Sequence, residues 1–362
     1  MAIWKIDELG EFVTLKRGYD LPQQKRKNGE IPIFSSSGVT GTHNEAMVEA
    51  PGVITGRYGT IGEVFFAETS FWPLNTTLYV ENFHENDEKF VYYFLKTLEW
   101  KKFASASAVP GINRNTVHKE IVRFPDFETQ QKIASVLSTI DKKIAVNKAI
   151  NDNLEQQAAA LFSSLYNRSN TEVRYTDLIQ ILGGGTPKTG ETAYWNGNIA
   201  FFTPKDVGTP YTFITEKTIT EEGLSHCNSR LYPVNTVFVT ARGTVGKVGL
   251  SGIPMAMNQS CYALVGKETH QLLVYFYTLK AVDRLKHKAS GAVFDAITTR
   301  DFDSEQIMKL SDDDAKAFLC VAEPMFQEML NNSIENLRLS TLRDFLLPKL
   351  MSGEIDVSSV QL

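Results

Sequence analysis

A duplicated set of motifs constrains the fold of this chain more than any other feature. A loop-like motif, Gly-Arg-Tyr-Gly-Thr-Ile-Gly, returns one residue shorter as Ala-Arg-Gly-Thr-Val-Gly, and three further landmarks recur around it in the same order. The landmark pairs, first copy against second, are residues 28–34 and 196–202, residues 53–64 and 239–248, Asn75 and Asn258, and residues 90–96 and 273–280. Because each landmark occurs only twice, the pattern predicts a duplicated pair of domains and not a solenoid of many short repeats.

Each copy passes from short β-like runs, broken by Gly and Pro, to one long helical pattern. In the first helix, apolar residues alternate steps of four and three, as in a coiled-coil seam, and the second helix follows the pattern more roughly. Since neither apolar stripe is stable in water alone, we predict that the two helices pack as an antiparallel coiled coil. The residues expected to pair the helices are Ile133, Leu137, Ile140, Ile144, Leu154, Leu161, Leu330, Ile334, Leu337 and Phe345.

The predicted fold class is α/β (α+β), with two tandem domains of mixed α/β structure, each followed by a long helix. A chain of 362 residues exceeds what one hydrophobic core usually supports. The expected limits are residues 1–128 for the first domain, 129–168 for the first spacer helix, 169–312 for the second domain, 313–353 for the second spacer helix and 354–362 for a C-terminal tail.

Local signals mark the ends and the register of the two helices. Asp126 is expected to cap the first helix, and Ser311 with Asp314 forms a capping arrangement for the second. Pro324 should kink the second helix or delay its start. Asn147 and Asn151 lie on the apolar seam, where they either fix the register or mark a frayed, wet part of it.

Composition excludes several classes of protein. Hydrophobic residues make up 43% and charged residues 22% of the chain, which is ordinary for a folded globular protein. Three separated cysteines argue against a disulfide framework. No apolar run approaches the ~20 residues of a membrane span, and the N-terminus lacks an export signal. We therefore expect a cytoplasmic protein without membrane association.

Catalytic motifs are missing from the sequence. The run at residues 183–187 matches neither a dinucleotide fingerprint nor a P-loop, so a tight loop is expected there. His226 and Cys227 have no second pair at metal-ligand spacing, so no metal site is predicted. The carboxylates at residues 312–314 lie at a helix start, where capping and the helix dipole explain them.

The remaining chemistry suits contact with DNA, although the formal net charge of −5 is unusual for a DNA-binding protein. Basic residues crowd residues 16–27 and 280–288, and each run is either a DNA contact or a solvated face. The two Arg-Gly-Thr loops place a guanidinium and glycine where an anion or base edge can approach, or else they are turns with a structural Arg. The candidate DNA-binding residues are Lys16, Arg17, Lys25, Arg26, Ser36, Thr40, Arg57, Tyr58, Thr60, Lys205, Arg242 and Thr244.

The order of these motifs is similar to that of the specificity subunit of type I restriction-modification systems. The resemblance runs from about residue 4 to 356 and includes Ile-Pro-Ile-Phe-Ser-Ser-Ser-Gly, Phe-Trp-Pro-Leu-Asn-Thr-Thr-Leu-Tyr-Val and Gln130-Gln131-Lys132-Ile133 before the first long helix. The closing helix, with Leu346-Leu347-Pro348-Lys349-Leu350, is also similar. The second copy departs from the family pattern in carrying Asp-Asp-Asp-Ala in place of the Gln-Gln pair before its long helix.

The resemblance implies two target recognition domains, each reading one half of a split double-stranded DNA sequence. It also implies two partner methyltransferase subunits, which carry S-adenosylmethionine, and motor-nuclease (restriction) subunits, while this chain holds no cofactor and is not itself an enzyme. The loop at residues 35–44 has no clear counterpart after Phe202, so we expect an asymmetric target. The alternative is a duplicated protein-protein adaptor that binds no nucleic acid. A free-standing nuclease or methyltransferase is disfavoured, because this sequence lacks the motifs of those enzymes.

Overall fold

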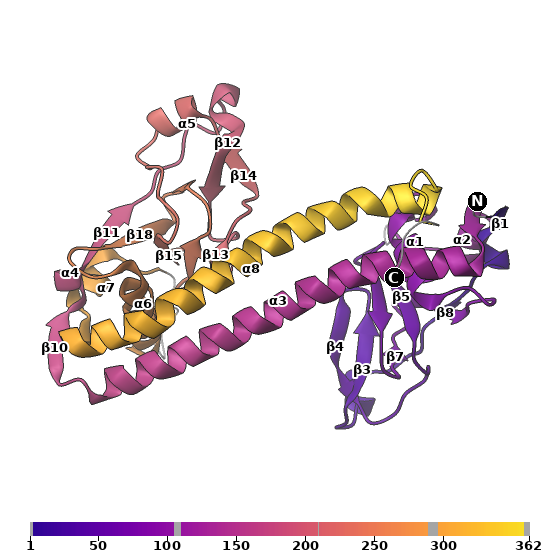
Figure 1. The fold of residues 1–362 in the computed structure, drawn as a ribbon, viewed down its shortest axis with the longest axis horizontal. Coiled ribbons are helices and arrows are strands. Elements are labelled where there is room, and N and C mark those ends of the chain that lie inside the picture. Colours follow the sequence, from indigo (N-terminus) through magenta and orange to yellow (C-terminus); the bar gives the residue numbers. More distant parts are fainter. Residues whose placement is uncertain (1–2, 105–109, 209, 289–295, 358–362) are drawn as a thin grey trace. The chain divides into compact units, whose positions relative to one another are not determined.

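The computed structural model describes residues 3–104, 110–208, 210–288 and 296–357. The chain forms two compact units: unit 1 comprises residues 1–146 and 336–362, and unit 2 comprises residues 147–335. Both units combine helices and strands, which confirms the predicted α/β class (Figure 1). The sequence analysis assigned each long helix to a segment of its own, whereas the compact units divide both long helices between them.

Unit 1 is built on a four-stranded antiparallel sheet in the order β2-β8-β5-β6. Its strands are β2 (Thr14–Arg17), β5 (Gly52–Gly56), β6 (Val64–Ala67) and β8 (Thr77–Asn82), with α1 (Glu88–Thr97) packed against β5 and β6. A smaller sheet contains β4 (Gly38–His43), β3 (Ile31–Ser35) and β7 (Trp72–Pro73), and β1 (Trp4–Glu8) pairs with β9 (Ile121–Pro125), which follows α2 (Arg114–His118). Every residue of β5 is buried, as expected for a central strand.

Unit 2 repeats this plan with a sheet in the order β11-β18-β15-β16-β13. Its strands are β11 (Ile179–Gly183), β13 (Tyr211–Thr212), β15 (Val237–Thr240), β16 (Val248–Ser251) and β18 (Cys261–Gly266), covered by α6 (Gln271–Lys288). The second sheet contains β14 (Lys217–Ile219), β12 (Trp195–Phe202) and β17 (Met255–Met257), and β10 (Thr171–Arg174) pairs with β19 (Gln306–Lys309). Three short helices complete the unit, α4 (Tyr175–Leu178), α5 (Glu221–Ser225) and α7 (Thr299–Ser304).

The two long helices are α3 (Phe127–Arg168) and α8 (Asp312–Ser352). Asp126 caps α3, because its Oδ1 accepts a hydrogen bond of 3.0 Å from the Thr129 amide. Ser311 caps α8 in the same way, with 3.1 Å between its Oγ and the Asp314 amide nitrogen. The prediction that Pro324 delays the start of the second helix is wrong, since the Ser311 cap starts α8 at Asp312 and the helix runs through the proline.

Within each unit, the parts of α3 and α8 that it contains run antiparallel. In unit 2, Asn151 donates to the Met329 carbonyl at 3.2 Å and accepts from Asn332 at 3.0 Å, while Arg168, later in α3, pairs with Asp314, earlier in α8. Asn147 and Asn151 are 0% and 9% exposed, so they are not on a wet or frayed stretch. In unit 1, Arg343 donates to Asp141 at 2.7 Å.

The apolar seam differs from the predicted heptad at its ends. Ile133, Leu137, Ile140, Ile144 and Leu330 are buried, and Leu154, Leu161, Ile334 and Leu337 are partly buried. Phe345 is 59% exposed, so the prediction that it pairs the helices is wrong. The reason is that each helix also packs on its own domain: Leu350 and Met351 share a core with Ile133 and Leu137. Phe162, which the heptad pattern missed, is fully buried in unit 2.

Among the residues that the structure describes, no helix combines the length and the apolar character needed to cross a membrane.

Candidate nucleic-acid interface

Loops from distant parts of the sequence meet at one end of the main sheet in unit 1. The strand register places Arg17 opposite Leu78 and Gly56 opposite Thr77, so β2 and β5 end where β8 begins. The loops that follow β2 and β5 and the turn that precedes β8 therefore share one edge of the sheet. Asp20 and Asn75, from two of these loops, are hydrogen-bonded to each other.

Main-chain hydrogen bonds hold the Arg57 loop in place. The amides of Arg57 and Tyr58 both donate to the Thr76 carbonyl, at 2.8 and 3.2 Å, and the Arg57 carbonyl accepts from the Ile112 amide at 3.1 Å. Gly59 and Gly62 have φ angles of +74° and +91°, which L side chains rarely adopt. These contacts hold the loop through its main chain and do not require particular side chains at its exposed positions.

The turn between β3 and β4 lies beside this loop. A β-carbon on Gly59 would be 3.3 Å from the Ser36 hydroxyl oxygen, so two of the predicted DNA-binding segments are adjacent. The Arg57 side chain is half-buried: its Nε donates to the Ile112 carbonyl at 3.3 Å, and its guanidinium lies 4.6 Å from the centre of the Tyr58 ring. Part of Arg57 is therefore structural, as the alternative interpretation held, while its terminal nitrogens have no hydrogen bond within the described residues.

Unit 2 reproduces the same main-chain frame. The amides of Ala241 and Arg242 donate to the Ser260 carbonyl at 2.8 and 3.3 Å, and the Ala241 carbonyl accepts from Ile297 at 2.9 Å. Gly243 and Gly246 have φ angles of +81° and +73°, like the two glycines of the first loop. The repeated loop is therefore the same main-chain structure built twice.

This frame corrects the alignment of the two loops. Ala241 occupies the position of Arg57, and Arg242 occupies that of Tyr58, so no residue is lost in the second copy. Gln259, not Asn258, corresponds to Asn75. Gln259 accepts a hydrogen bond from Thr186, and Asn75 donates one to Asp20. The sequence alignment matched Arg with Arg, whereas the left-handed glycines set the true register. Arg242 is exposed, and its guanidinium has no partner within the described residues.

The predicted residues Lys205 and Thr244 lie together at the edge of unit 2. Thr244 donates its hydroxyl to the Pro204 carbonyl at 3.1 Å, and Lys205 forms an ion pair of 3.2 Å with Glu216. A cavity of about 460 Å³ opens between these segments. Its lining consists of Thr203, Pro204, Lys205, Glu216, Lys217, Gly243, Thr244 and Asn258.

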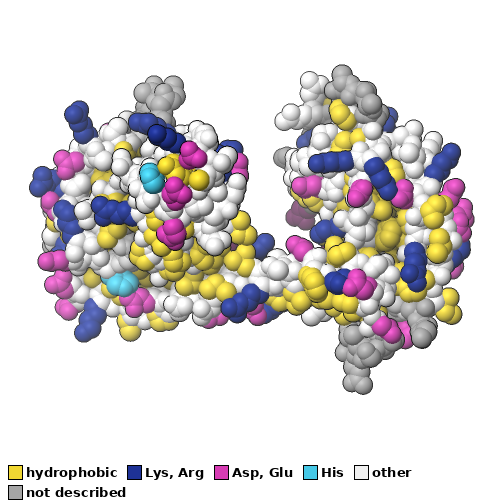
Figure 2. All heavy atoms as spheres, turned by 90° about the horizontal axis from the view of Figure 1, so that it is seen from above, with side chains coloured by type: hydrophobic (Ala, Val, Ile, Leu, Met, Phe, Trp, Pro, Cys, Tyr) yellow, Lys and Arg dark blue, Asp and Glu magenta, His cyan; other side chains and the backbone are white. Residues whose placement is uncertain are grey.

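The basic residues of the first run do not act as one patch. Lys16 pairs with Glu81 at 2.5 Å, and this hydrogen bond holds the pKa of Lys16 above its ordinary value. Arg17 pairs with Asp20 at 3.5 Å, at the edge that carries Arg57. Arg26 reaches the Thr40 carbonyl at 3.5 Å beside exposed Lys25, and within the described residues no hydrogen bond joins this group to the Arg57 loop. Figure 2 shows basic side chains interspersed with acidic ones in each unit.

The sequence analysis missed the two segments that form main-chain hydrogen bonds with the repeated loops. Ile112 and Ile297 supply the amides that bond the Arg57 and Ala241 carbonyls. Each isoleucine precedes a capped helix, with Asn113 capping α2 and Thr298 capping α7. The repetition of Gly-Ile-Asn-Arg as Ala-Ile-Thr-Thr-Arg was the available signal, a fifth landmark of the duplication.

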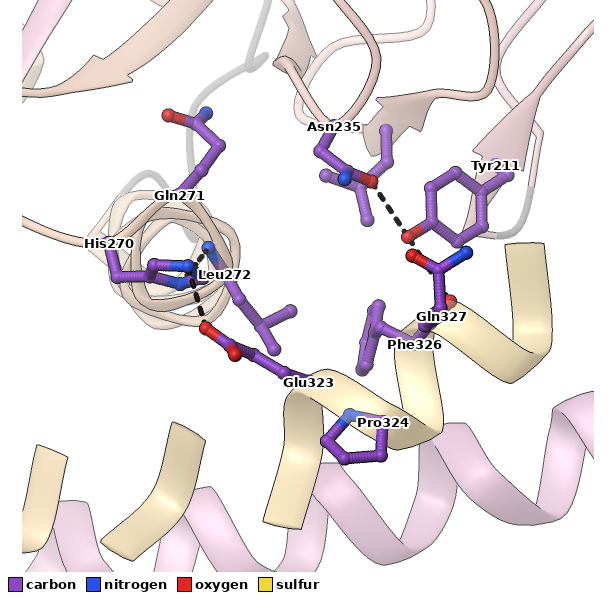
Figure 3. Close-up of a pocket in the computed structure, with 10 residues that line it drawn as sticks. Tyr211, Asn235, His270, Gln271, Leu272, Glu323, Pro324, Phe326 and Gln327 are labelled. Atoms are coloured by element: carbon purple, nitrogen blue, oxygen red, sulfur yellow. Dashed lines mark hydrogen bonds and ion pairs between the residues drawn. The ribbon is translucent and has the colours of Figure 1, made fainter. Parts of the chain in front are cut away.

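A separate cavity of about 430 Å³ in unit 2 lies between α6, α8 and the strands near Tyr211 (Figure 3). The Nε2 of His270 lies 2.7 Å from a carboxylate oxygen of Glu323, and Tyr211 donates to Asn235 at 2.9 Å. Neither Lys nor Arg is among the residues that line it, so its chemistry does not suit a phosphate. No cluster of three or more metal-ligating side chains occurs in the described part of the chain.

Comparisons with known proteins agree with this arrangement. The family description "Type I restriction modification DNA specificity domain" matches residues 1–156 and 167–309. The type I restriction enzyme HindI specificity subunit of Haemophilus influenzae is 25% identical over 345 residues, covering 72% of this chain and 75% of that protein. The EcoR124I/EcoR124II specificity subunit of Escherichia coli is 29% identical over 204 residues, covering 52% of this chain and 50% of that protein.

The crystal structure of a type I restriction-modification S subunit from M. genitalium has a similar fold, with a TM-score of 0.66, 17% identity, and coverage of 97% of this chain and 96% of that one. The family match covers both copies of the duplicated loop. The chain therefore belongs to the type I restriction-modification specificity subunits, the proteins that provide DNA sequence specificity in these systems.

Proposed function

We propose that this chain reads a two-part DNA target, one part with each unit, and catalyses no reaction itself. The observation that carries the proposal is the repeated loop, in which one main-chain frame presents Arg57 and Tyr58 in unit 1 but Ala241 and Arg242 in unit 2. A fixed frame with exchangeable side chains suits the reading of base edges, because hydrogen bonds to bases carry sequence information whereas phosphate contacts only position the protein.

In this function the chain holds no cofactor and depends on partner subunits for chemistry. Two methyltransferase subunits would supply S-adenosylmethionine and the methyl-transfer site, and motor-nuclease subunits would join for cleavage. The chain has a net charge of −5, an excess of negative charge, so the partners would also have to supply positive charge for non-specific binding to phosphates. Such a complex would act on the DNA of its host, so we propose that the chain works in the cytoplasm.

The deciding experiment is a genome-wide map of methylated adenines in the host, with and without the gene for this chain. We expect a motif of two short specified parts separated by unspecified bases, lost when the gene is deleted and restored by complementation. An electrophoretic mobility shift assay with the chain and its methyltransferase distinguishes this function from that of a protein-protein adaptor. A protein-protein adaptor would leave DNA unshifted and every methylated motif unchanged.

A further inference from the structure

The basic run at the end of α6 is divided by the structure into groups with different partners. Arg284 and Lys288 bind the carboxylate of Glu305, which is 0% exposed, at 2.9 and 2.5 Å. Lys280 donates to Ser163 at 3.1 Å, and His287 lies 3.7 Å from Asp283. Lys286 is different: it is exposed, and its ammonium has no hydrogen bond or ion pair within the described residues.

Lys286 lies against the loop that carries Arg242. A β-carbon built on Gly246 would be 2.6 Å from the Lys286 Cε, 3.3 Å from its Nζ and 3.0 Å from Val282. The glycine thus serves two purposes, since its φ of +73° is left-handed and its missing side chain leaves room for the lysine stem. The stem packs on the loop while the charged end stays in water, which is the usual arrangement for a long cationic side chain.

The loop itself carries two further cations without partners. Hydrogen bonds from the Thr240 amide to the Lys247 carbonyl, at 2.9 Å, and from the Gly246 amide to the Thr240 carbonyl, at 2.8 Å, close it into a compact unit. Arg242 and Lys247 are exposed on it and have no side-chain partner within the described residues. Three positive charges therefore belong to one closed loop and the helix beside it, and none of them is paired with a carboxylate among the residues that the structure describes.

The equivalent place in unit 1 is built differently. Gly62 stands where Gly246 stands, and a β-carbon on it would meet Trp100 at 3.0 Å instead of a lysine. Glu63 replaces Lys247, since the Glu63 carbonyl accepts from Gly56 as the Lys247 carbonyl accepts from Thr240. The one cation of this loop, Arg57, is partly tied to the Ile112 carbonyl. The first loop itself therefore has no excess positive charge, whereas the second has two cations, Arg242 and Lys247. Lys101 and Lys102 lie near Gly62 and Glu63 in unit 1, but they belong to the segment around Trp100, and Lys102 pairs with Glu120 at 2.5 Å.

We propose that Lys286, with Lys247, binds a backbone phosphate of the DNA beside the Arg242 loop, and that unit 1 has no contact built from the same two positions. The proposal rests on the proposed function and adds a residue and a chemical role that the loop repeat does not give. A phosphate is the ligand of choice because a lysine acts as a point charge, whereas base recognition usually uses the planar fork of arginine or a side-chain amide.

The test measures DNA binding by the full chain assembled with its methyltransferase, using the methylated motif and an unrelated duplex across a range of salt concentrations. Lys286→Met keeps the stem on Gly246 and removes only the charge. We expect it to weaken binding to both duplexes roughly three- to tenfold at low salt and to reduce the slope of log affinity against log salt by about one. Lys286→Arg should retain the slope.

Lys316→Ala is the matched control, because it removes one exposed positive charge from α8 of the same unit. It should leave the slope unchanged, and thermal unfolding should show that all variants remain folded. A wild-type slope for Lys286→Met would overturn the proposal, and so would a loss confined to the specific duplex, which would indicate a base contact. If the wild-type complex binds neither duplex, the proposed function fails instead.

Discussion

At the scale of single residues, Arg57 and Arg242 stand at different positions of the repeated loop, Arg57 at the first in unit 1 and Arg242 at the second in unit 2. We therefore expect their substitution to affect stability and DNA binding differently. Arg57→Ala removes the Nε bond to Ile112 as well as any DNA contact, so it should lower the melting temperature and weaken binding. Arg242→Ala should weaken binding without a change in stability, because its guanidinium has no partner among the described residues. Thermal unfolding and DNA titration of both variants check this.

The same titrations distinguish the kinds of contact. If either arginine touches phosphate, all sequences should bind more weakly and the salt slope should fall; if it reads a base, discrimination at one position should relax by ~1–3 kcal/mol. Lys at each position is a useful comparison, since it keeps the charge but loses the two-pronged hydrogen bond. Unchanged binding by a folded Arg57→Ala protein would make the first loop purely structural.

Asp126 predicts a pH-dependent contribution to stability. Its carboxylate accepts hydrogen bonds from the amides of Thr129 and Ile3, and these lower its pKa below the ordinary value. Because the folded pKa is the lower one, the stabilisation is complete above the unfolded value and is lost as the pH falls through the folded pKa. Asp126→Ala should cost about 1 kcal/mol at neutral pH, and the difference from wild type should shrink in acid.

Asp126→Asn is the control for the Asp126 prediction, because asparagine also caps helices but does not titrate. It should retain most of the stability at neutral pH and show no change in its capping contribution in acid. Chemical denaturation of the three proteins across the acidic range measures both effects. A constant difference between wild type and Asp126→Ala at every pH would contradict the argument.

At the scale of elements, α3 and α8 connect the two units, and their lengths are predicted to set the spacing of the half-sites. Four residues inserted between Ile144 and Leu154 lengthen the helix by about 6 Å. The sharpest place is the junction of Val146 and Asn147, with a matching insertion between Glu335 and Asn336, because the helix pairings inside each unit then stay intact. We expect at most about two base pairs of extra spacer and unchanged half-sites.

Methylation mapping of the doubly lengthened variant tests the spacing. A one-residue insertion at the same two places serves as the control, since it turns each helix by about 100° and should disturb assembly instead of lengthening the spacer. An active, folded variant with four added residues and the original spacer would show that the partners or the DNA set the distance.

The elements were predictable where local signals decide them. The caps at Asp126 and Ser311 follow from side chains that bond the first free amides of a helix, so the helix starts could be placed from sequence. The C-terminal end of the apolar seam could not be predicted, because the burial of Leu350 and Met351 depends on the core of unit 1 and not on helical periodicity. Phe345 therefore fits the heptad pattern and yet faces water.

At the scale of the whole molecule, the two units should read different sequences. The turn beside the first loop carries Ser36, whereas Pro204 and Lys205 lie beside the second, and Glu63 stands where unit 2 has Lys247. Two readers with different side chains and different charges predict a motif whose halves are unrelated. The methylation map checks this directly, and a perfectly palindromic motif would count against it.

The duplication and the α/β class were visible in the sequence because four landmarks recur in order. The residue-by-residue alignment of the two loops was not visible, because the sequence comparison paired Arg57 with Arg242 and not the glycines with each other. The main-chain hydrogen bonds to Thr76 and Ser260 show that Arg57 corresponds to Ala241. The run at 280–288 was also ambiguous, because the sequence does not show that the buried Glu305 pairs with Arg284 and Lys288 but not with Lys286.

The main-chain frame of the two loops has a consequence for how such a protein changes over generations. Carbonyls and left-handed glycines hold each loop, so mutations at the exposed tips barely alter folding. New target sequences can therefore arise without a loss of stability that other mutations must first compensate. Because L side chains rarely adopt the left-handed φ of these glycines, we expect a change of target to come from the side chains between the glycines and not from the glycines themselves.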